Sequence, residues 1–250
     1  MLIPALLLIA MLALLGWFVR NDGKEYDRFK ELSTTEERQR AFRRWTARSF
    51  LLFSGASLAA LLLLGRLDTL IRFPAEFVGL SKRLSDGPDG FGLDMVLGLV
   101  GALFVGVLIG MAFRSWFLRR RAQPRPPKVI GDIAPMLPRN RDERKWTALL
   151  GANAGLGEEL FFRLMLPLLI VQVGGGAILA FTAAGLIFGL VHFYQGWVGI
   201  VATTVVGFVF TGIYLASGTI WAAVILHALM NLNSLWLQPL LTDRRTRAEA

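Results

Sequence analysis

The amino-acid sequence predicts an all-α protein, a polytopic transmembrane helix bundle of about seven helices with a buried polar site in its C-terminal four-helix part. Two observations lead to this prediction. Hydrophobic residues make up 54% of the 250-residue chain, the mean hydropathy is +0.54, and the apolar residues fall in separate blocks. A helix needs about 20 apolar residues to cross a bilayer core of about 30 Å, and blocks of this length recur along the chain.

The apolar blocks and a run of prolines define the organisation of the chain. We expect spans near 2–19, 49–65, 93–113, 146–171, 176–193, 197–215 and 219–239. The first block has no basic residues before it and no small-residue cleavage site after it, so we expect a retained anchor rather than a signal peptide. Between the third and fourth spans a continuous helix is forbidden by Pro124, Pro126, Pro127, Pro135 and Pro138. We therefore divide the chain into an N-terminal transmembrane region (1–145), a transmembrane domain (146–240) and a basic tail (241–250).

Lys and Arg cluster between the apolar blocks. The 27 Lys and Arg residues include nine in 20–48, ten in 114–145 and three in the tail. With an odd number of spans these segments share one side, which the positive-inside rule makes cytoplasmic. We therefore expect an integral, multi-pass protein of the plasma (inner) membrane with a cytoplasmic C-terminus. The net charge is +9, and we expect the basic clusters to face anionic lipid headgroups. We expect no nucleic-acid partner, because no polar domain surrounds the clusters.

The first basic segment has a pattern of its own. In residues 24–48, acidic and basic side chains recur at helical spacing and are interleaved with Phe29, Phe42 and Trp45. This pattern predicts a helix that lies along the cytoplasmic membrane surface. A solvated charged helix without a special role fits the same pattern.

The second half of the chain holds few ionisable side chains. Cysteine is absent from the sequence, which excludes disulfides and thiol nucleophiles. Between residues 146 and 239 the ionisable carboxylates, guanidinium group and imidazoles are Glu158, Glu159, Arg163, His192 and His227. Each lies in or beside an apolar helix, where a charge costs at least about 3 kcal/mol at mid-bilayer. These groups therefore need mutual partners or a wet cavity, and a functional site is the default hypothesis.

The two glutamates have different local surroundings. Glu159 and Arg163 are four residues apart and share a helix face, so we expect an ion pair between them. Glu158 lies about 100° round the helix from Glu159 and has no local partner. It is therefore free to hold and deprotonate a water molecule.

The two histidines each share a helix face with another residue. Phe188 and His192 lie on one face, where Gly185 and Gly189 allow close helix approach, and His227 shares a face with Asn231. Taken singly, an intramembrane His or Asn is often a structural hydrogen-bonding residue, and Phe188 fits packing. Function is favoured by convergence, because three helices with short connections bring these groups together.

The predicted spans place two of these residues at different depths. Glu158 lies about 18 Å along its helix from residue 146, whereas His192 comes near the cytoplasmic end of its own helix. Either the Glu158 helix begins in the cytoplasm or the His192 helix continues to about Gln195. In both cases we expect a water-accessible cavity that opens to the cytoplasm.

The ordered spacings E-E-x-x-x-R, F-x-x-x-H and H-x-x-x-N on three hydrophobic helices resemble the CPBP intramembrane protease family (CAAX prenyl endoprotease and bacteriocin-processing, Abi-like). The resemblance covers roughly 146–240 and not the first 145 residues, so substrate choice does not transfer. It implies an intramembrane endopeptidase that hydrolyses a peptide bond by glutamate-activated water. It also implies a protein or peptide substrate, and the family name suggests prenylated CAAX proteins.

The resemblance also implies a role for each matching residue. Glu158, with His192, would position and activate the attacking water, and His227 and Asn231 would donate hydrogen bonds to the oxyanion. Glu159 and Arg163 would orient the helix and tune Glu158. Arg163 and Phe188 would support the site from beside it.

A metal site and three different functions stay open at the level of the sequence. Glu158, His192 and His227 have the donor atoms of a three-ligand zinc site with an open water position, and the family is often named as metalloproteases. The sequence lacks an H-E-x-x-H pair, and Glu158 would have to be either ligand or base, so a metal-free mechanism is favoured. The histidines could instead be axial ligands of a haem. A non-catalytic immunity or scaffold protein and a proton relay also fit these residues, although no inverted repeat supports a transporter.

Overall fold

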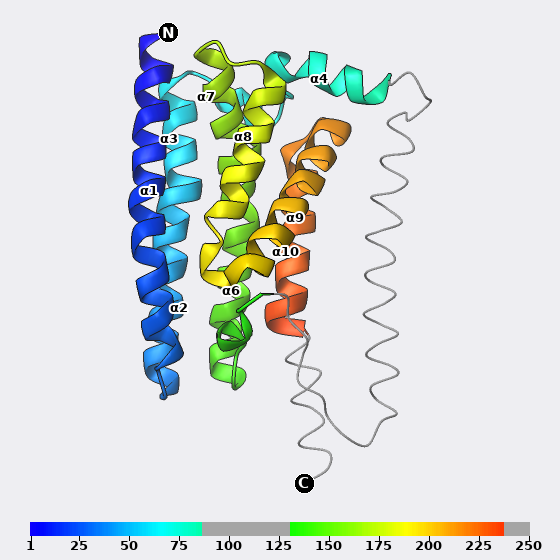
Figure 1. The fold of residues 1–250 in the computed structure, drawn as a ribbon. Coiled ribbons are helices and arrows are strands. Elements are labelled where there is room, and N and C mark those ends of the chain that lie inside the picture. Colours follow the sequence, from blue (N-terminus) through cyan, green and yellow to red (C-terminus); the bar gives the residue numbers. More distant parts are fainter. Residues whose placement is uncertain (87–130, 238–250) are drawn as a thin grey trace.

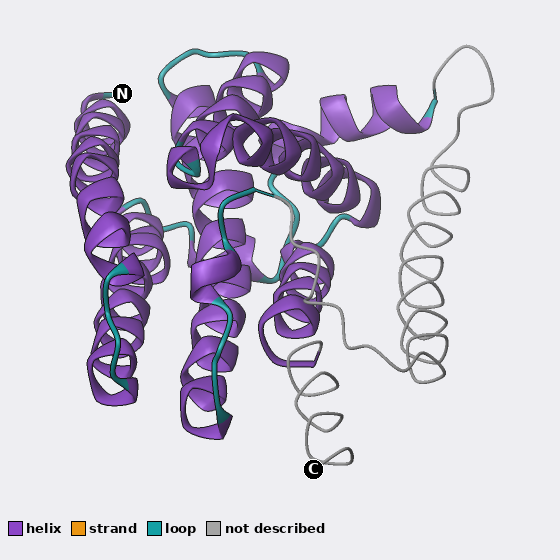
Figure 2. Ribbon diagram, turned by 60° about the horizontal axis from the view of Figure 1, so that its bottom comes forward, coloured by secondary structure: helices purple, strands orange, loops and turns teal. Residues whose placement is uncertain are grey.

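The computed structural model of the protein describes residues 1–86 and 131–237, and every regular element in these ranges is a helix. Figure 2 shows helices and connecting loops in this part of the chain and no strands. The predicted all-α bundle is therefore confirmed. Several predicted features lie outside the described residues: the span at 93–113, most of the basic segment 114–145, three of the five prolines and the tail 241–250.

The N-terminal part is a long helical hairpin followed by a short crossing helix. Its elements are α1 (Leu2–Lys30), α2 (Thr35–Ser49), the π-helix η1 (Phe50–Gly55), α3 (Ala56–Leu63), the 3₁₀ helix η2 (Leu67–Leu70) and α4 (Ala75–Ser85). Helices α2, η1 and α3 follow one another without a break. Figure 1 shows this continuous helix side by side with α1, while α4 lies across one end of the bundle.

The predicted surface helix at 24–48 is not a separate element. Residues up to Lys30 continue α1, and residues from Thr35 onward continue into the next long helix. Thr34 caps the second helix with a capping box, in which its side chain accepts from the Glu37 amide and the Glu37 carboxylate accepts from Thr34. The aromatic residues of this segment pack with Leu150 rather than on a membrane surface: Tyr26, Phe29 and Phe42. The interfacial interpretation was therefore wrong.

The C-terminal part contains the remaining helices. They are the 3₁₀ helix η3 (Ala134–Met136), α6 (Arg141–Glu159), the π-helix η4 (Leu160–Met165), α7 (Leu166–Gln172), α8 (Ala177–Leu190), the 3₁₀ helix η5 (Phe193–Gln195), α9 (Gly196–Ser217), α10 (Ile220–Leu232) and the π-helix η6 (Asn233–Leu237). Helices α6, η4 and α7 form one continuous helix. All six residues of η4 are buried, so the middle of this helix is the centre of the bundle.

Four helices of the described residues are long and apolar enough to cross a membrane. They are Leu2–Lys30, Thr35–Leu63, Phe193–Ser217 and Ile220–Leu237, and Ala177–Leu190 is a shorter apolar helix. These helices indicate a multi-pass membrane protein. The continuous helix through α6 and α7 is long but carries three charged residues, Glu158, Glu159 and Arg163, in its apolar part.

Close helix packing holds α6 against α10 and α8 against α9. A Cβ atom added at Gly155 of α6 would lie 2.5 Å from the backbone nitrogen of Ala228 in α10. A Cβ atom at Gly189 of α8 would lie 1.8 Å from the Thr204 hydroxyl oxygen of α9, in agreement with the close approach predicted there. Small residues let helix backbones approach where no hydrophobic force drives association in lipid.

A buried ion pair joins the N-terminal hairpin to the start of α6. Arg38 Nε lies 3.0 Å from Glu143 Oε2, and both side chains are fully buried. Arg38 Nη2 also donates to the carbonyl oxygens of Pro135 (2.9 Å) and Leu137 (3.1 Å). One guanidinium therefore fixes α2, the segment before α6 and α6 itself relative to one another.

We predict that Gly155→Ala destabilises the protein by about 1–3 kcal/mol, because the added methyl group meets backbone atoms that cannot rotate away. Gly212→Ala on α9 is the matched control, since a Cβ atom there meets nothing within 4 Å. The control is expected to be neutral or slightly stabilising, as alanine is a better helix former than glycine. The apparent melting temperature in detergent measures both. Equal melting temperatures for the two variants would show that α6 and α10 are not in backbone contact.

Candidate active site

Glu158 and His192 meet because their helices form a hairpin. The two residues are nearly equidistant from the turn 173–176 that joins α7 to α8, so they lie at the same level. His192 Nε2 is 3.9 Å from Glu158 Oε2. Helix α6 begins at Arg141, five residues before the predicted span, whereas α8 ends at Leu190 and does not continue as an α-helix to Gln195. The π-helix η4 follows Glu158 directly, and π-helical turns are frequent at functional sites.

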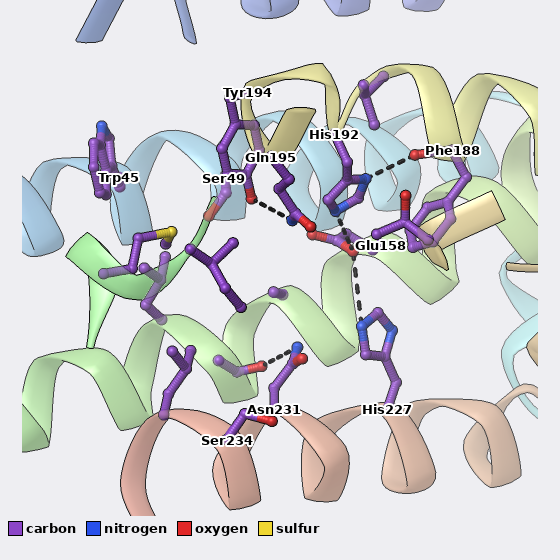
Figure 3. Close-up of a pocket in the computed structure, with 18 of the residues that line it drawn as sticks. Trp45, Ser49, Glu158, Phe188, His192, Tyr194, Gln195, His227, Asn231 and Ser234 are labelled. Carbon is purple, nitrogen blue, oxygen red and sulfur yellow. Dashed lines mark hydrogen bonds and ion pairs between the residues drawn. The ribbon is translucent and has the colours of Figure 1, made fainter. Parts of the chain in front are cut away.

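His227 approaches the same carboxylate from α10. Its Nε2 atom is also 3.9 Å from Glu158 Oε2. Figure 3 shows Glu158 between the His192 and His227 rings. The three side chains are largely but not fully buried, with 13%, 12% and 5% of Glu158, His192 and His227 exposed. The structure therefore brings together the three residues that the sequence placed on three different helices.

The other ring nitrogen of each histidine has its own partner. His192 Nδ1 lies 2.7 Å from the Phe188 carbonyl oxygen, and His227 Nδ1 lies 2.6 Å from Glu159 Oε1. Both partners accept, so each Nδ1 carries the proton and donates. In the neutral rings both Nε2 atoms are then acceptors, as is the Glu158 carboxylate. Three acceptors thus converge on one small volume, which suits a shared donor.

The buried Glu159 carboxylate has two partners, the Arg163 cation and the His227 ring N–H donor. Its Oε1 atom lies 3.1 Å from Arg163 Nη1, an ion pair without hydrogen-bond alignment, and 2.6 Å from His227 Nδ1. Arg163 Nη2 donates to the Gly207 carbonyl oxygen at 3.1 Å. Glu159 is fully buried and Arg163 is 1% exposed. The predicted ion pair is present, and it also holds α10 and α9 against the central helix.

Aromatic rings complete the surroundings of these polar groups. The Arg163 guanidinium lies 4.2 Å from the centroid of Phe188, and the Phe188 ring lies 4.8 Å from that of His192. Phe210 of α9 stacks on His227 at 4.8 Å and 18°. Sequence reasoning missed Phe210, because nothing distinguishes it from the other apolar residues of its helix. It supports the cation and the imidazole through its ring face.

Asn231 lies one turn after His227 and faces the same cavity. Its Nδ2 atom donates to the Gly151 carbonyl oxygen at 3.2 Å. An amide nitrogen carries two hydrogens, so a second N–H remains available. The structure therefore does not place Asn231 against Glu158 but leaves it one donor for a group in the cavity.

A cavity of about 410 Å³ is lined by Glu158, His192, His227 and Asn231. Its lining is mostly apolar and extends from Glu158 to Trp45 and Leu235. Figure 3 shows part of this lining around the labelled side chains. The N-terminal region contributes three residues of α1 to the wall: Phe18, Asp22 and Tyr26. Sequence reasoning missed this contribution, because no pattern in the first 145 residues identifies it.

The same residues were tested as a zinc site. Glu158, His192 and His227 have suitable donor atoms, and both histidine Nε2 atoms lie 3.9 Å from Glu158 Oε2. Among the described residues, no group of three or more His, Asp or Glu side chains has the arrangement of a metal site. The mechanism proposed for this site uses no metal ion.

Comparison with known families matches one segment of the chain. The sequence model of a family described as type II CAAX prenyl endopeptidase Rce1-like matches residues 142–233. Residues 142–233 are a domain of this CPBP family. This CPBP domain contains all the residues of the three spacings, and membership indicates a membrane protease. No curated protein and no solved structure matches the chain.

We predict effects of very different size on stability for substitutions of the two neighbouring glutamates. Glu159→Gln leaves the Arg163 charge buried and uncompensated, which is expected to cost about 3–5 kcal/mol. Glu158→Gln removes a carboxylate that makes no hydrogen bond with the described residues, so the unfolding free energy should change by less than about 1 kcal/mol. Thermal or denaturant unfolding of both variants in detergent measures the difference. Similar losses for both would contradict the division of roles.

Proposed function

We propose that the protein is a membrane endopeptidase in which Glu158, with His192, activates a water molecule for attack on a peptide bond. The observation that carries this proposal is the 3.9 Å separation between Glu158 Oε2 and each histidine Nε2 atom. This distance is too long for a direct hydrogen bond and suits groups bridged by a water molecule. A water molecule has two hydrogens to donate, and the Glu158 carboxylate and the two histidine Nε2 atoms can accept both.

The proposed reaction begins with proton transfer from this water to Glu158. The water oxygen attacks the carbonyl carbon, and the carbonyl oxygen becomes an oxyanion. Collapse of this intermediate breaks the carbon–nitrogen bond, and Glu158 returns the proton to the leaving amine. Since water attacks directly, no covalent intermediate with the protein forms.

The proposed oxyanion donors are Asn231 and His227. Asn231 has one amide N–H that is not used by Gly151. His227 donates its Nδ1 proton to Glu159, so its Nε2 atom is a donor only in the protonated ring. Glu159 and Arg163 act on the reaction by holding His227 and the Glu158 helix in position.

The proposed substrate is a protein or peptide segment that enters the cavity from the cytoplasmic side. The cavity lies toward the end of the bundle that carries the basic hairpin turn and the start of α6, which the positive-inside rule makes cytoplasmic. Anionic lipids of the plasma membrane are the proposed contact of these basic residues. Prenylated CAAX proteins are the substrate class that the family name suggests, and the mostly apolar cavity lining is compatible with them.

The geometry gives less support to a haem protein. Two axial histidines would present Nε2 atoms to opposite faces of a macrocycle. Here both Nε2 atoms lie 3.9 Å from the same carboxylate oxygen. A hydrolytic site accounts for this carboxylate, whereas a haem site does not.

We predict that Glu158→Gln in proteoliposomes lowers the rate of peptide cleavage by about 10²- to 10⁴-fold, the usual contribution of a general base. The assay uses a panel of peptides with and without a prenyl group. Asp142→Asn, an exposed carboxylate on the same helix, is the control and should keep the wild-type rate. Equal rates for wild type and Glu158→Gln would overturn the proposal. A chelator should leave the wild-type rate unchanged. If a chelator abolished cleavage and added zinc restored it, the metal-free mechanism would be overturned.

We predict that Asn231→Ala lowers kcat by about 10²- to 10³-fold, because it removes a donor to the oxyanion. KM should change little, since the oxyanion exists only in the transition state. Steady-state kinetics on one cleaved peptide separates the two constants. A rise in KM at unchanged kcat would assign Asn231 to substrate binding.

A further inference from the structure

One face of α1 is turned toward the rest of the bundle, and this face is apolar at every position except one. Residues on this face recur at spacings of three and four: Met11, Leu15, Phe18, Asp22, Tyr26 and Phe29. Four of them are at least 94% buried, and Phe18 packs against the main apolar cluster. Asp22 carries the only charge in this stripe. A charged residue in a buried apolar stripe is the informative exception to hydrophobic patterning.

The Asp22 side chain faces the cavity that contains Glu158. Phe18 and Tyr26, one turn to either side, line the same wall. Within the described residues Asp22 makes no hydrogen bond or ion pair. Of the residues that the structure describes, the cavity lining includes two carboxylates, Asp22 and Glu158, and no Lys or Arg.

Arg48 is the cation that attracts the Asp22 carboxylate most strongly. Other groups, however, hold the Arg48 side chain in position. Its guanidinium is bonded to the Glu25 carboxylate, which also accepts from the Trp45 indole. It lies 5.5 Å from the ring centroid of Trp17 and 5.6 Å from that of Phe18. Arg48 therefore has a partner of its own, and Asp22 is left for a group that enters the cavity.

We propose that Asp22 is a specificity-determining residue that binds a basic side chain of the substrate. This inference rests on the proposed peptidase function of the same cavity. A partly buried carboxylate without a partner is costly, and a Lys or Arg of the substrate would offset that cost. The same charge disfavours acidic residues and free carboxylates beside it, so the preferred substrate is a basic segment.

The test is a set of peptides that differ in one side chain. A lysine is moved through each position near the scissile bond of a cleaved peptide, and each peptide is paired with one that has norleucine there. At one position wild type should cleave the lysine peptide at least about tenfold better in kcat/KM, the value of one hydrogen bond to a charged group. Asp22→Asn should remove this preference and keep the norleucine rate.

Two further variants keep the test decisive. Asp27→Asn changes an exposed carboxylate on the same helix and should keep the lysine preference. Asp22→Glu retains the charge and should also keep it, which decides the case if Asp22→Asn cleaves neither peptide. The inference would be overturned if the wild-type enzyme had no preference for lysine. It would also be overturned if the preference survived Asp22→Asn or was lost in Asp22→Glu. Wild-type rates for Glu158→Gln would instead overturn the peptidase function.

Discussion

Glu159 is fully buried and shares one carboxylate oxygen between the Arg163 guanidinium and the Nδ1 atom of His227. A buried charge is tolerated only when it is paired, so these three groups must stay together in the folded protein. The pairing fixes the tautomer of His227 and holds α10 against the central helix. Because adjacent residues of a helix point about 100° apart, Glu158 does not face the groups that Glu159 contacts. Glu158 therefore faces the cavity without a direct hydrogen-bond partner among the described residues.

The division between the two glutamates links stability to function. In the proposed mechanism one carboxylate organises the bundle and the other carries the chemistry, although they are adjacent in sequence. The packing around them is consistent with this arrangement, since Gly155 brings α10 close and the π-helix η4 is wholly buried. The N-terminal hairpin then supplies the opposite wall of the cavity, and Arg38 fixes that hairpin to α6 through Glu143. A site built on rigid helices can hold its groups in a constant geometry.

Much of this arrangement follows from local sequence patterns. The helical spans outside the undescribed ranges, the Glu159–Arg163 pair and the isolation of Glu158 all follow from helix periodicity. The approach of His192 to Glu158 was expected from the three spacings, whereas the predicted spans placed the two residues at different depths because they began the Glu158 helix at residue 146 rather than at Arg141. Other features depend on contacts between distant segments, which periodicity does not contain: the stacking of Phe210 on His227, the π-helical turn and the cavity wall formed by α1. The segment 24–48 was misread for the same reason, because its aromatic residues fit both a membrane surface and a neighbouring helix.

The central claim is that a water molecule between Glu158 and the two histidines is the nucleophile. An experimental structure in lipid, at a resolution that shows ordered solvent, tests it most directly. The account predicts a water within hydrogen-bond distance of Glu158 Oε2 and His192 Nε2, with Glu159 still bonded to Arg163 and His227. A metal ion at that position, or a direct hydrogen bond between Glu158 and a histidine that leaves no room for water, would contradict it.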